Sequence, residues 1–421
     1  MHDASTPQGA NDGEPTAQDV AQGRLEVARI LLDNHWLAHA EQQCQAALRL
    51  DGGTAELASA LLRKIKERRD NPSALDLSQR NAPIAVCKGD GSIISTLHFR
   101  CQENERLKRE AFRQAVTYID VETSSQCNRR CLYCPNSRND RLSFNRFMDD
   151  AVFIPFINNL RAIGYSRELH FVGFNEPLMH RENILGRVTL ARRLLPRAVI
   201  VVFTNGDYLD RPYLEQLIVA GMNKMIISVH LAADKPYDDE AILERINRLA
   251  LALNTPIVPT GYAAGAFIRA RLIHSGADIT IRQTDYRRYG SNRASSLENV
   301  GPQIDVRMAA CLLPIHQFIV GHEGKVVPCC TMVSDDPRNA ARIVGNIAED
   351  SSIFDIYCGS AMVNWRRGLF NIGPKRPPCE KCADNADAPL LNAPALYEPW
   401  AHFVSLTPIE PALLPYSCNA G

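Results

Sequence analysis

The sequence predicts an α/β protein: a partial (β/α)6 barrel, similar to a TIM barrel, with a helical cap before it and a small cysteine-containing domain after it. Three observations carry this prediction. Helical periodicity fills 18–69, short β-branched runs alternate with amphipathic helical segments over 116–299, and beyond about 300 the alternation gives way to Gly, Pro and paired cysteines.

The N-terminal part is polar at first and then helical. Residues 1–17 predict a disordered tail. In 18–69, apolar residues recur at spacings of three and four, which resembles a tetratricopeptide-type helical hairpin with one extra helix. We interpret it as a cap packed on the main domain, with a partner-docking module as the alternative. Residues 70–115 are expected to form a linker that contains a small hairpin near 89–95.

The central part, 116–299, is expected to build a parallel sheet from βα units, because strand-like and helix-like segments alternate. Functional sites on such sheets lie at the carboxyl ends of the strands. The expected strands lie at 117–122, 168–173, 198–204, 224–230, near 266–272 and at 278–282, and the expected helices near 149–163, 181–195, 211–221 and 237–253.

The composition and charge of the chain argue against some classes of function. The 421 residues are 45% hydrophobic and carry 47 basic and 47 acidic side chains, so the formal net charge is zero. This balance argues against a protein built mainly to coat nucleic acid or an anionic membrane. No apolar run reaches the roughly 20 residues of a membrane helix, and no secretory signal opens the chain, so we expect a cytoplasmic protein. In that reducing compartment, the clustering of the 13 cysteines indicates metal rather than disulfides.

The first cysteine group directly follows the first expected barrel strand. Cys127, Cys131 and Cys134 lie on one short loop with C-x3-C-x2-C spacing. Three thiolates can hold three corners of an iron–sulfur cube and leave the fourth iron open to a chelating substrate. The alternative is structural zinc, which takes four ligands, and no fourth local ligand is present here.

This spacing, with an aromatic residue just before the last cysteine, resembles the signature of the radical S-adenosylmethionine (SAM) superfamily. The resemblance implies a [4Fe–4S] cluster whose open iron binds SAM, and reductive cleavage of SAM to a 5′-deoxyadenosyl radical. It also implies that Tyr133 lies against the adenine.

The second expected strand ends in a segment that resembles the family's Gly-Gly-Glu-Pro motif. Gly173, Glu176 and Pro177 match, whereas Phe174 and Asn175 replace glycine-like positions. The resemblance implies that this backbone and the Glu176 carboxylate bind the ammonium group of SAM. The alternative is that Glu176 is an ordinary surface carboxylate.

Two further strand ends carry polar residues that suit the same site. Thr204 and Asn205 end the third strand and resemble the family, although they also read as a simple turn. Ser228 and His230 end the fourth strand, where they are expected to face the SAM ribose or the substrate, with a structural histidine as the alternative.

The second cysteine group falls in 300–390. Gly324 is expected to turn a hairpin that leads to Cys329 and Cys330. The group resembles the SPASM domain, and more closely its shorter form, twitch, which implies one fully ligated auxiliary [4Fe–4S] cluster. A four-cysteine zinc site is the alternative, and Cys330 is an alternative to Cys329. The ligands that this resemblance implies are Cys311, Cys329, Cys379 and Cys382.

After this group, residues 391–421 are expected to form a C-terminal tail.

The resemblance implies radical dehydrogenation of a polar small molecule such as an aminocyclitol or sugar, with the auxiliary cluster as electron acceptor and a flavodoxin- or ferredoxin-type reductant as partner. One alternative is a peptide-modifying enzyme. Another is an epimerase in which Cys330 or Cys358 returns a hydrogen atom, although each thiol also reads as a small buried hydrophobe. A non-enzymatic scaffold is the third. Four arginines of one run are candidates for a substrate anion, or form a solvated face: Arg282, Arg287, Arg288 and Arg293.

Overall fold

A computed structural model describes residues 16–33, 37–50, 52–70, 84–87, 93–143, 145–233, 235–350 and 352–384. The expected C-terminal tail at 391–421 lies outside these residues, as does all but the last two residues of the expected tail at 1–17. The chain divides into two compact units, the helical unit (Met1–Thr96) and the sheet unit (Leu97–Gly421).

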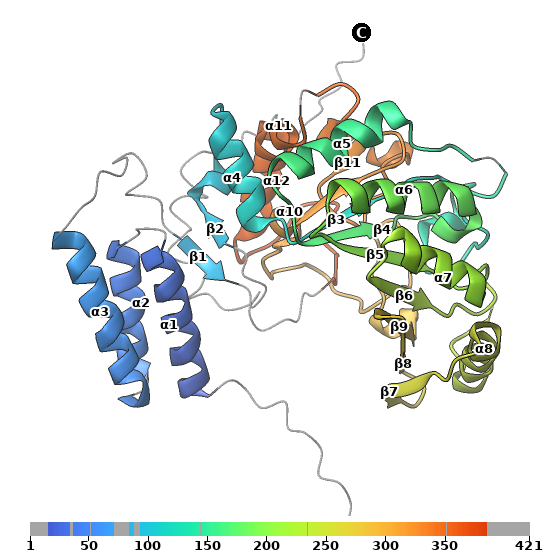
Figure 1. Ribbon diagram of the computed structural model, residues 1–421, viewed down its shortest axis with the longest axis horizontal. Helices are drawn as coiled ribbons and strands as arrows, with labels where there is room; N and C mark the ends of the chain where they lie inside the picture. Colours follow the sequence, from blue (N-terminus) through green and yellow to red (C-terminus); the bar gives the residue numbers. More distant parts are fainter. Residues whose placement is uncertain are drawn as a thin grey trace, which may run out of the picture. The chain divides into compact units, whose positions relative to one another are not determined.

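The helical unit contains the helices that the periodicity predicts, α1 (Ala17–Asp33), α2 (Leu37–Leu50) and α3 (Ala55–Asp70) (Figure 1). Their apolar stripes meet in a core of small and aliphatic side chains that includes Leu25, Ala28, Cys44, Ala47 and Leu61. The expected hairpin is also present, because β1 (Ile84–Cys87) pairs antiparallel with β2 (Ile93–Ser95).

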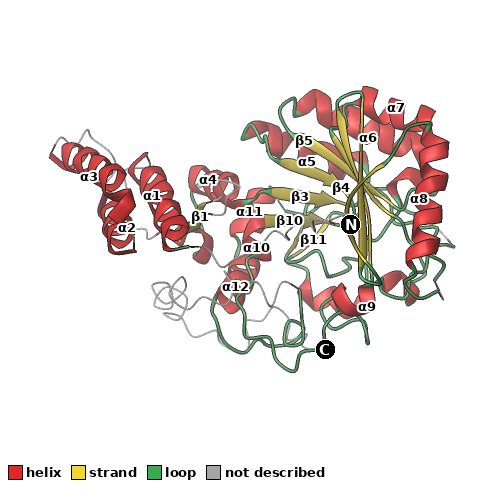
Figure 2. Cartoon of the chain, turned by 90° about the horizontal axis from the view of Figure 1, so that it is seen from below, coloured by secondary structure: helices red, strands yellow, loops and turns green. Residues whose placement is uncertain are grey.

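Four βα units build the centre of the sheet unit. The strands β3 (Tyr118–Val121), β4 (Glu168–Phe171), β5 (Val199–Thr204) and β6 (Lys224–Ser228) pair in parallel in this order. Their helices are α5 (Asp150–Ala162), α6 (Arg181–Leu194), α7 (Arg211–Ala220) and α8 (Asp239–Leu253). These elements confirm the first four units expected from the sequence, and Figure 2 shows α5–α8 on one face of the sheet.

The last third of the expected barrel is different. The segment expected as a fifth barrel strand is β8 (Phe267–His274), which pairs antiparallel with β7 (Val258–Ala263) and β9 (Ala277–Thr284). A parallel crossover needs about a dozen residues, whereas only Ser275 and Gly276 join β8 to β9, both with positive φ. The expectation of six βα units is therefore wrong here, although β9 still runs parallel to β6.

The C-terminal cysteine segment is not separate from the sheet. β10 (Gln317–Val320) pairs in parallel with β3 and continues through β11 (Lys325–Val327) and β12 (Gly345–Asn346), giving ten strands in the order β12-β11-β10-β3-β4-β5-β6-β9-β8-β7. The expected hairpin is confirmed, with Gly324 at φ 81° in its turn.

The end of the expected linker is structured as well. Residues 105–115 form α4 (Glu105–Ala115), which the Asn104 side chain caps. Phe112 on α4 packs edge-on against Phe318, Phe354 and Tyr357 at ring-centroid distances of 5.4, 5.4 and 5.1 Å. The aromatic residues of 300–390 therefore join the main core, which is why this segment does not need a core of its own.

The remaining elements are η1 (Gly52–Thr54), η3 (Thr96–Phe99), η4 (Pro135–Ser137), η5 (Pro177–Met179), α9 (Tyr286–Tyr289), α10 (Leu313–His316), η6 (Pro337–Arg342), α11 (Ile353–Cys358) and α12 (Ser360–Phe370).

Alternation along the strands gives the sheet two unlike faces. Side chains such as Ile119, Leu169 and Ile200 are fully buried in the main hydrophobic core. Asp120, His170 and Phe203 on the same three strands point to the other face and line a cavity. The carboxyl ends of the parallel strands open into the same cavity, where the sequence places its candidate site.

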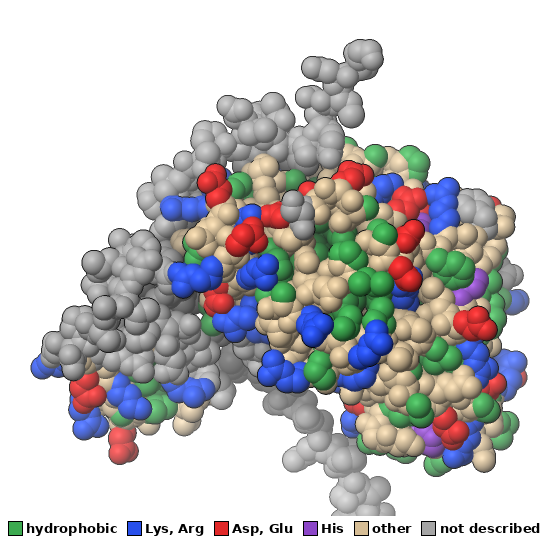
Figure 3. Space-filling view, turned by 45° about the horizontal axis from the view of Figure 1, so that its top comes forward, with side chains coloured by type: hydrophobic (Ala, Val, Ile, Leu, Met, Phe, Trp, Pro, Cys, Tyr) green, Lys and Arg blue, Asp and Glu red, His purple; other side chains and the backbone are tan. Residues whose placement is uncertain are grey.

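Along the part of the chain that the structure describes, no helix combines the length and hydropathy needed to cross a bilayer. On the face shown in Figure 3, basic and acidic side chains lie among apolar and uncharged polar ones, in keeping with the zero net charge.

Candidate active site

A cavity of about 490 Å³ lies on the inner face of the sheet and brings most of the predicted site residues together. Pro177 is the exception among the candidate SAM-binding residues, because it is buried as the first residue of η5. The predicted residues that line the cavity are Cys127, Cys131, Tyr133, Cys134, Gly173, Asn175, Glu176, Thr204, Asn205, Ser228, His230 and Cys330.

The loop of the first three cysteines is held in shape by its own backbone. The Cys127 N–H donates to the Arg141 carbonyl and the Cys134 N–H to the Cys131 carbonyl, both at 2.9 Å. Burial raises the pKa of the Cys127 thiol to about 12, and burial also raises those of Cys131 and Cys134. Since metals bind thiolates, loading this site releases protons.

The Glu176 carboxylate is buried at the cavity wall and is not a surface carboxylate, since the residue is 2% exposed. It accepts hydrogen bonds from the Thr204 hydroxyl at 2.7 Å, the Asn205 N–H at 2.7 Å and the Leu178 N–H at 3.0 Å. Burial raises its pKa to about 7, although these hydrogen bonds act in the opposite direction. Its charge therefore changes near neutral pH.

The turn before Glu176 fits its sequence without strain. A Cβ on Gly173 would lie 2.6 Å from Glu122 Oε1, so glycine is needed there. Phe174 and Asn175 are not among the positive-φ residues, so replacing glycine at these positions imposes no backbone cost. The Asn175 amide instead donates to the Ser124 hydroxyl at 3.0 Å.

Tyr133 is part of an aromatic group in which sequence reasoning missed one member. Its ring stacks on Tyr286 with centroids 4.1 Å apart, and its hydroxyl lies 2.8 Å from His230 Nδ1. Burial lowers the pKa of His230 to about 3, so the imidazole is neutral. Tyr286 lines the cavity together with Ser228. Its position inside an arginine-rich run hid it, because such runs usually form solvated faces.

The cysteine loop is also tied to the end of β5. The Asn205 amide donates to Asn128 Oδ1 at 2.8 Å, and the Arg129 guanidinium forms a two-pronged ion pair with Asp207 at 2.6 and 2.7 Å. These contacts fix the loop between the first two cysteines against the strand end that carries Thr204.

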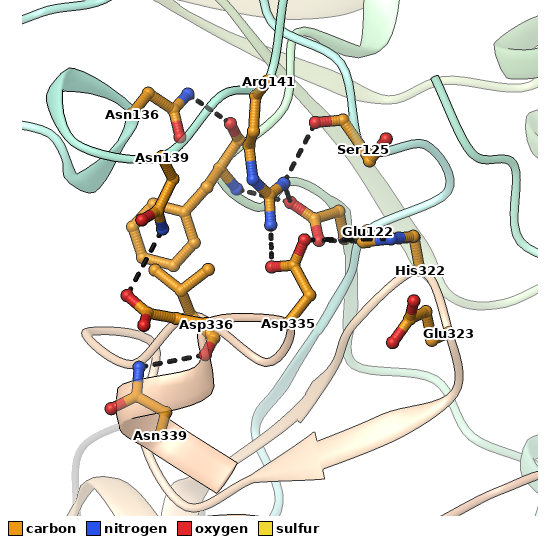
Figure 4. A network of polar contacts seen from close by, with 12 residues as sticks. Glu122, Ser125, Asn136, Asn139, Arg141, His322, Glu323, Asp335, Asp336 and Asn339 are labelled. Carbon is orange, nitrogen blue, oxygen red and sulfur yellow. Dashed lines mark hydrogen bonds and ion pairs between the residues drawn. The ribbon is translucent and has the colours of Figure 1, made fainter. Parts of the chain in front are cut away.

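A buried network centred on Glu122 joins three segments around the cavity (Figure 4). Glu122 accepts from Arg141 Nη1 at 2.6 Å, from the Phe174 N–H at 2.8 Å and from His322 at 3.0 Å. Arg141 also pairs with Asp335. Burial alone would raise the pKa of Glu122, but Arg141 and His322 together lower it to about 2. One carboxylate thus connects the cysteine loop, the turn before Glu176 and the β10–β11 hairpin, a link that the sequence did not reveal.

The second cysteine group converges from distant segments. Cys329 and Cys379 lie in one small apolar cluster. Burial raises the pKa of Cys311 to about 12, with the nearby Cys329 and Cys382 adding to the rise, and Cys379 is raised by burial and by the other three thiols. Among the described residues, no three His, Cys, Asp or Glu side chains are arranged around a single metal ion. The grouping therefore rests on mutual proximity and on the all-thiol donor set.

Cys330 is distinguished from Cys329 by its surroundings. Cys330 lines the cavity, whereas Cys329 lies near the other three thiols, and the thiols of these two neighbours contact one another. The buried Arg307 guanidinium donates to the carbonyls of Cys382 at 3.0 Å and Ala310 at 2.9 Å. It supplies positive charge beside the thiols, a contribution that sequence reasoning missed.

Cys358 does not belong to the site, and its assignment as a hydrogen donor is wrong. It is 1% exposed in the main core, where its thiol contacts the Lys108 carbonyl at 3.7 Å. Of the four candidate arginines, Arg282 and Arg293 line the cavity, while Arg287 borders a different, smaller pocket.

The comparisons with known proteins agree with this geometry. Residues 121–252 match the model of the radical SAM superfamily, and residues 311–383 match that of SPASM, an iron–sulfur cluster-binding domain. The S-adenosyl-L-methionine-dependent 2-deoxy-scyllo-inosamine dehydrogenase of Niallia circulans is 27% identical over 251 residues, which are 60% of this chain and 86% of that protein.

Two other matches are more distant. The GTP 3′,8-cyclase of Chlorobaculum tepidum is 27% identical over 145 residues, 34% of this chain and 42% of that protein. The crystal structure of BtrN in complex with AdoMet and 2-DOIA is 25% identical and covers 61% of this chain and 87% of that one, with a TM-score of 0.45. The two matches fall on the two cysteine groups, so the chain carries a radical SAM domain over 121–252 and a SPASM iron–sulfur cluster-binding domain over 311–383.

Proposed function

We propose that this radical SAM oxidoreductase oxidises a carbinol of an aminocyclitol or a related sugar-like molecule to a ketone. The observation that carries the proposal is the cavity itself, which has the three-thiol loop and Glu176 on its wall and Cys330, the neighbour of the four-thiol group, on the same wall. The similarity to a 2-deoxy-scyllo-inosamine dehydrogenase supports the substrate class.

The donor sets suit the cofactors of the family. SAM on the first [4Fe–4S] cluster supplies a 5′-deoxyadenosyl radical, and the second [4Fe–4S] cluster accepts an electron. Cys127, Cys131 and Cys134 would hold the first cluster, and Cys311, Cys329, Cys379 and Cys382 the second. We prefer Cys329 to Cys330 because Cys330 faces the cavity.

The remaining residues position SAM and substrate. Glu176, ionised at or above about pH 7, would accept the SAM ammonium. Tyr133 and the neutral His230 would border the adenine and ribose, with the Tyr286 ring holding Tyr133 in place. Arg282 and Arg293 would bind polar groups of the substrate. A flavodoxin- or ferredoxin-type protein in the cytoplasm would supply the reducing electron. We also propose that the sheet curves into a partial barrel and that the helical unit serves as a cap.

The test uses anaerobically reconstituted protein with SAM, a reductant and 2-deoxy-scyllo-inosamine. We expect about eight irons per chain, and one 5′-deoxyadenosine for each ketone formed. A variant with Cys127, Cys131 and Cys134 all replaced by Ala should form neither product. Absence of ketone with the wild-type protein would overturn the proposed substrate class, and about four irons with one zinc would overturn the second cluster.

One observation keeps the epimerase as a second candidate, because Cys330 lines the cavity where a hydrogen donor must lie. An epimerase would incorporate solvent deuterium into a product with unchanged oxidation state, and Cys330→Ala would abolish that incorporation. A dehydrogenase forms ketone in that variant as well.

A further inference from the structure

A line of hydrogen-bonded side chains leads from the cavity to the exposed end of the sheet. His170 Nδ1 lies 2.9 Å from Asp120 Oδ1, and His170 Nε2 lies 2.9 Å from Glu168 Oε2. Glu168 Oε1 in turn accepts from Lys224 Nζ at 2.7 Å. Four side chains on three strands thus form one unbroken chain of contacts.

The two ends of this line have different environments. Asp120 and His170 both line the cavity and are 9% and 8% exposed. The side chains of Glu168 and Lys224 do not line it and are 36% and 43% exposed. The line therefore begins at the substrate side and ends in water.

Sheet register fixes the inner part. Asp120 and His170 are direct partners across the parallel β3–β4 pair. Tyr118 stacks on the His170 ring with centroids 5.3 Å apart and an interplanar angle of 16°, and its hydroxyl donates to Gln317 at 3.1 Å. The imidazole is thus held between two carboxylates without freedom to turn.

We propose that Asp120 accepts the hydroxyl proton of the substrate and that His170 passes it to Glu168 and out to solvent. This inference rests on the proposed carbinol oxidation. Asp120 is the catalytic residue, since it faces the substrate space, and His170 and Glu168 are positioning and relay residues.

The proton balance of the reaction requires such an acceptor. Oxidation of a carbinol to a ketone removes one hydrogen atom from carbon, one electron and one proton from oxygen. The bound SAM would supply the radical that takes the hydrogen atom, and the auxiliary cluster would take the electron, which leaves the proton. As the O–H bond breaks, the proton binds to the Asp120 carboxylate, and the neutral imidazole takes it at its free Nδ1 while releasing its Nε2 proton to Glu168.

The relay lies at the same end of the cavity as the electron acceptor. Asp120 pairs in register with Ile319 on β10, and Ile319 pairs with Val327 on β11, two residues before Cys329. Proton and electron would therefore leave the substrate in the same direction, which avoids building up charge in the cavity.

The groups that face His170 favour its charged form. Burial lowers the pKa of the imidazole, but Asp120 and Glu168 outweigh burial and raise it. Phe203 on β5 contributes only an aromatic contact, at 5.2 Å between ring centroids. The nearby cation Lys224 is already paired with Glu168. Asp120 and Glu168 thus stabilise the imidazolium that forms when the neutral ring takes up a proton.

The first experiment compares Asp120→Asn and His170→Gln with the wild-type holoenzyme, using SAM and 2-deoxy-scyllo-inosamine. Loss of a general base lowers rates by about 10²–10⁴-fold, so we expect ketone formation to fall by this factor while 5′-deoxyadenosine formation falls far less. The matched control is Asp278→Asn, a carboxylate at the exposed end of β9 that is paired with Arg271 and does not line the cavity. An equal loss of both products in Asp120→Asn would mean a structural role and would overturn the relay.

The second experiment needs no substrate and separates failure of the relay from failure of the proposed function. The protonation of His170 is followed by NMR in the oxidised holoprotein with labelled histidine, with His170→Gln identifying the signal. We expect the pKa of His170 to lie above that of an ordinary histidine, because Asp120 and Glu168 flank the ring, and to fall in Asp120→Asn. A His170 pKa that does not change in Asp120→Asn would overturn the relay, whatever the protein does to the aminocyclitol.

Discussion

The two cysteine sites are built in opposite ways. The first takes its three thiols from one loop of eight residues, Cys127–Cys134, and lies on the wall of an open cavity. The second takes four thiols from segments near 311, 329 and 379–382, and these do not line that cavity. The comparison teaches that the reactive site is local in sequence and lies on the cavity, whereas the accessory site is assembled from distant segments beside it.

The adjacent pair Cys329 and Cys330 gives the strongest test of this difference between the two sites. Replacing Cys329 by Ala should remove about half of the iron, because a closed four-thiolate site loses a ligand. Cys330→Ala should keep all of it, because this thiol faces the cavity. Iron and sulfide analysis of the two reconstituted variants decides the matter. Equal iron loss in both, or loss only in Cys330→Ala, would reverse the ligand assignment.

A second test concerns the buried Glu122 network, which connects the segments around the cavity. Glu122→Gln leaves Arg141 and His322 without their buried anion, so we expect a loss of about 3–5 kcal/mol in the free energy of unfolding. Glu323→Gln on the same hairpin removes a partly exposed partner of Arg146 and Lys325 and should cost less than about 1 kcal/mol. Denaturant unfolding of both variants gives the two values.

The same carboxylate predicts a pH dependence with a definite sign. The pKa of Glu122 is lowered from an ordinary 4.5 to about 2 in the folded protein. Its contribution to stability is thus fully present above about pH 4.5 and is lost as the pH falls toward 2. The wild-type protein should lose stability over this window more steeply than Glu122→Gln, and parallel curves would contradict the network.

The smallest expected effect concerns SAM binding at the open site. Since burial raises the pKa of Glu176 to about 7, its carboxylate is ionised above that pH and protonated below it. If it binds the SAM ammonium, affinity should weaken by up to about tenfold per pH unit below 7. Equilibrium titrations at several pH values, repeated with Glu176→Gln, measure this. A dependence that persists in the variant would assign the titration to another group.

The features that could be predicted from the sequence are those that depend on residues close together in the chain. The cysteine loop, Glu176 and the four βα units each depend on neighbouring residues and were found where expected, apart from the ligand roles, which remain predictions. The turn between β8 and β9 was the exception: Ser275-Gly276 is a turn dipeptide, but a crossover to a parallel strand was expected there.

The parts that were missed depend on contacts between distant segments. Glu122 reads as the end of a strand, and nothing in its sequence shows that Arg141 and His322 close around it. Cys329 and Cys330 are indistinguishable as letters, and only the fold turns one toward the thiols and the other toward the cavity. Asp120 and His170 became partners only through strand register.

The pairing of β10 with β3 also bears on how the chain is made. Tyr118 meets Gln317 across 199 residues of sequence, so one edge of the central sheet stays open while all of that chain emerges from the ribosome. At 5–20 residues per second this takes roughly 10–40 s. During that interval β3 presents unpaired backbone groups of the kind that aggregate or recruit chaperones. Because β10 also leads into the second cysteine group, loading of the auxiliary cluster has to wait until translation of the sheet unit is almost finished.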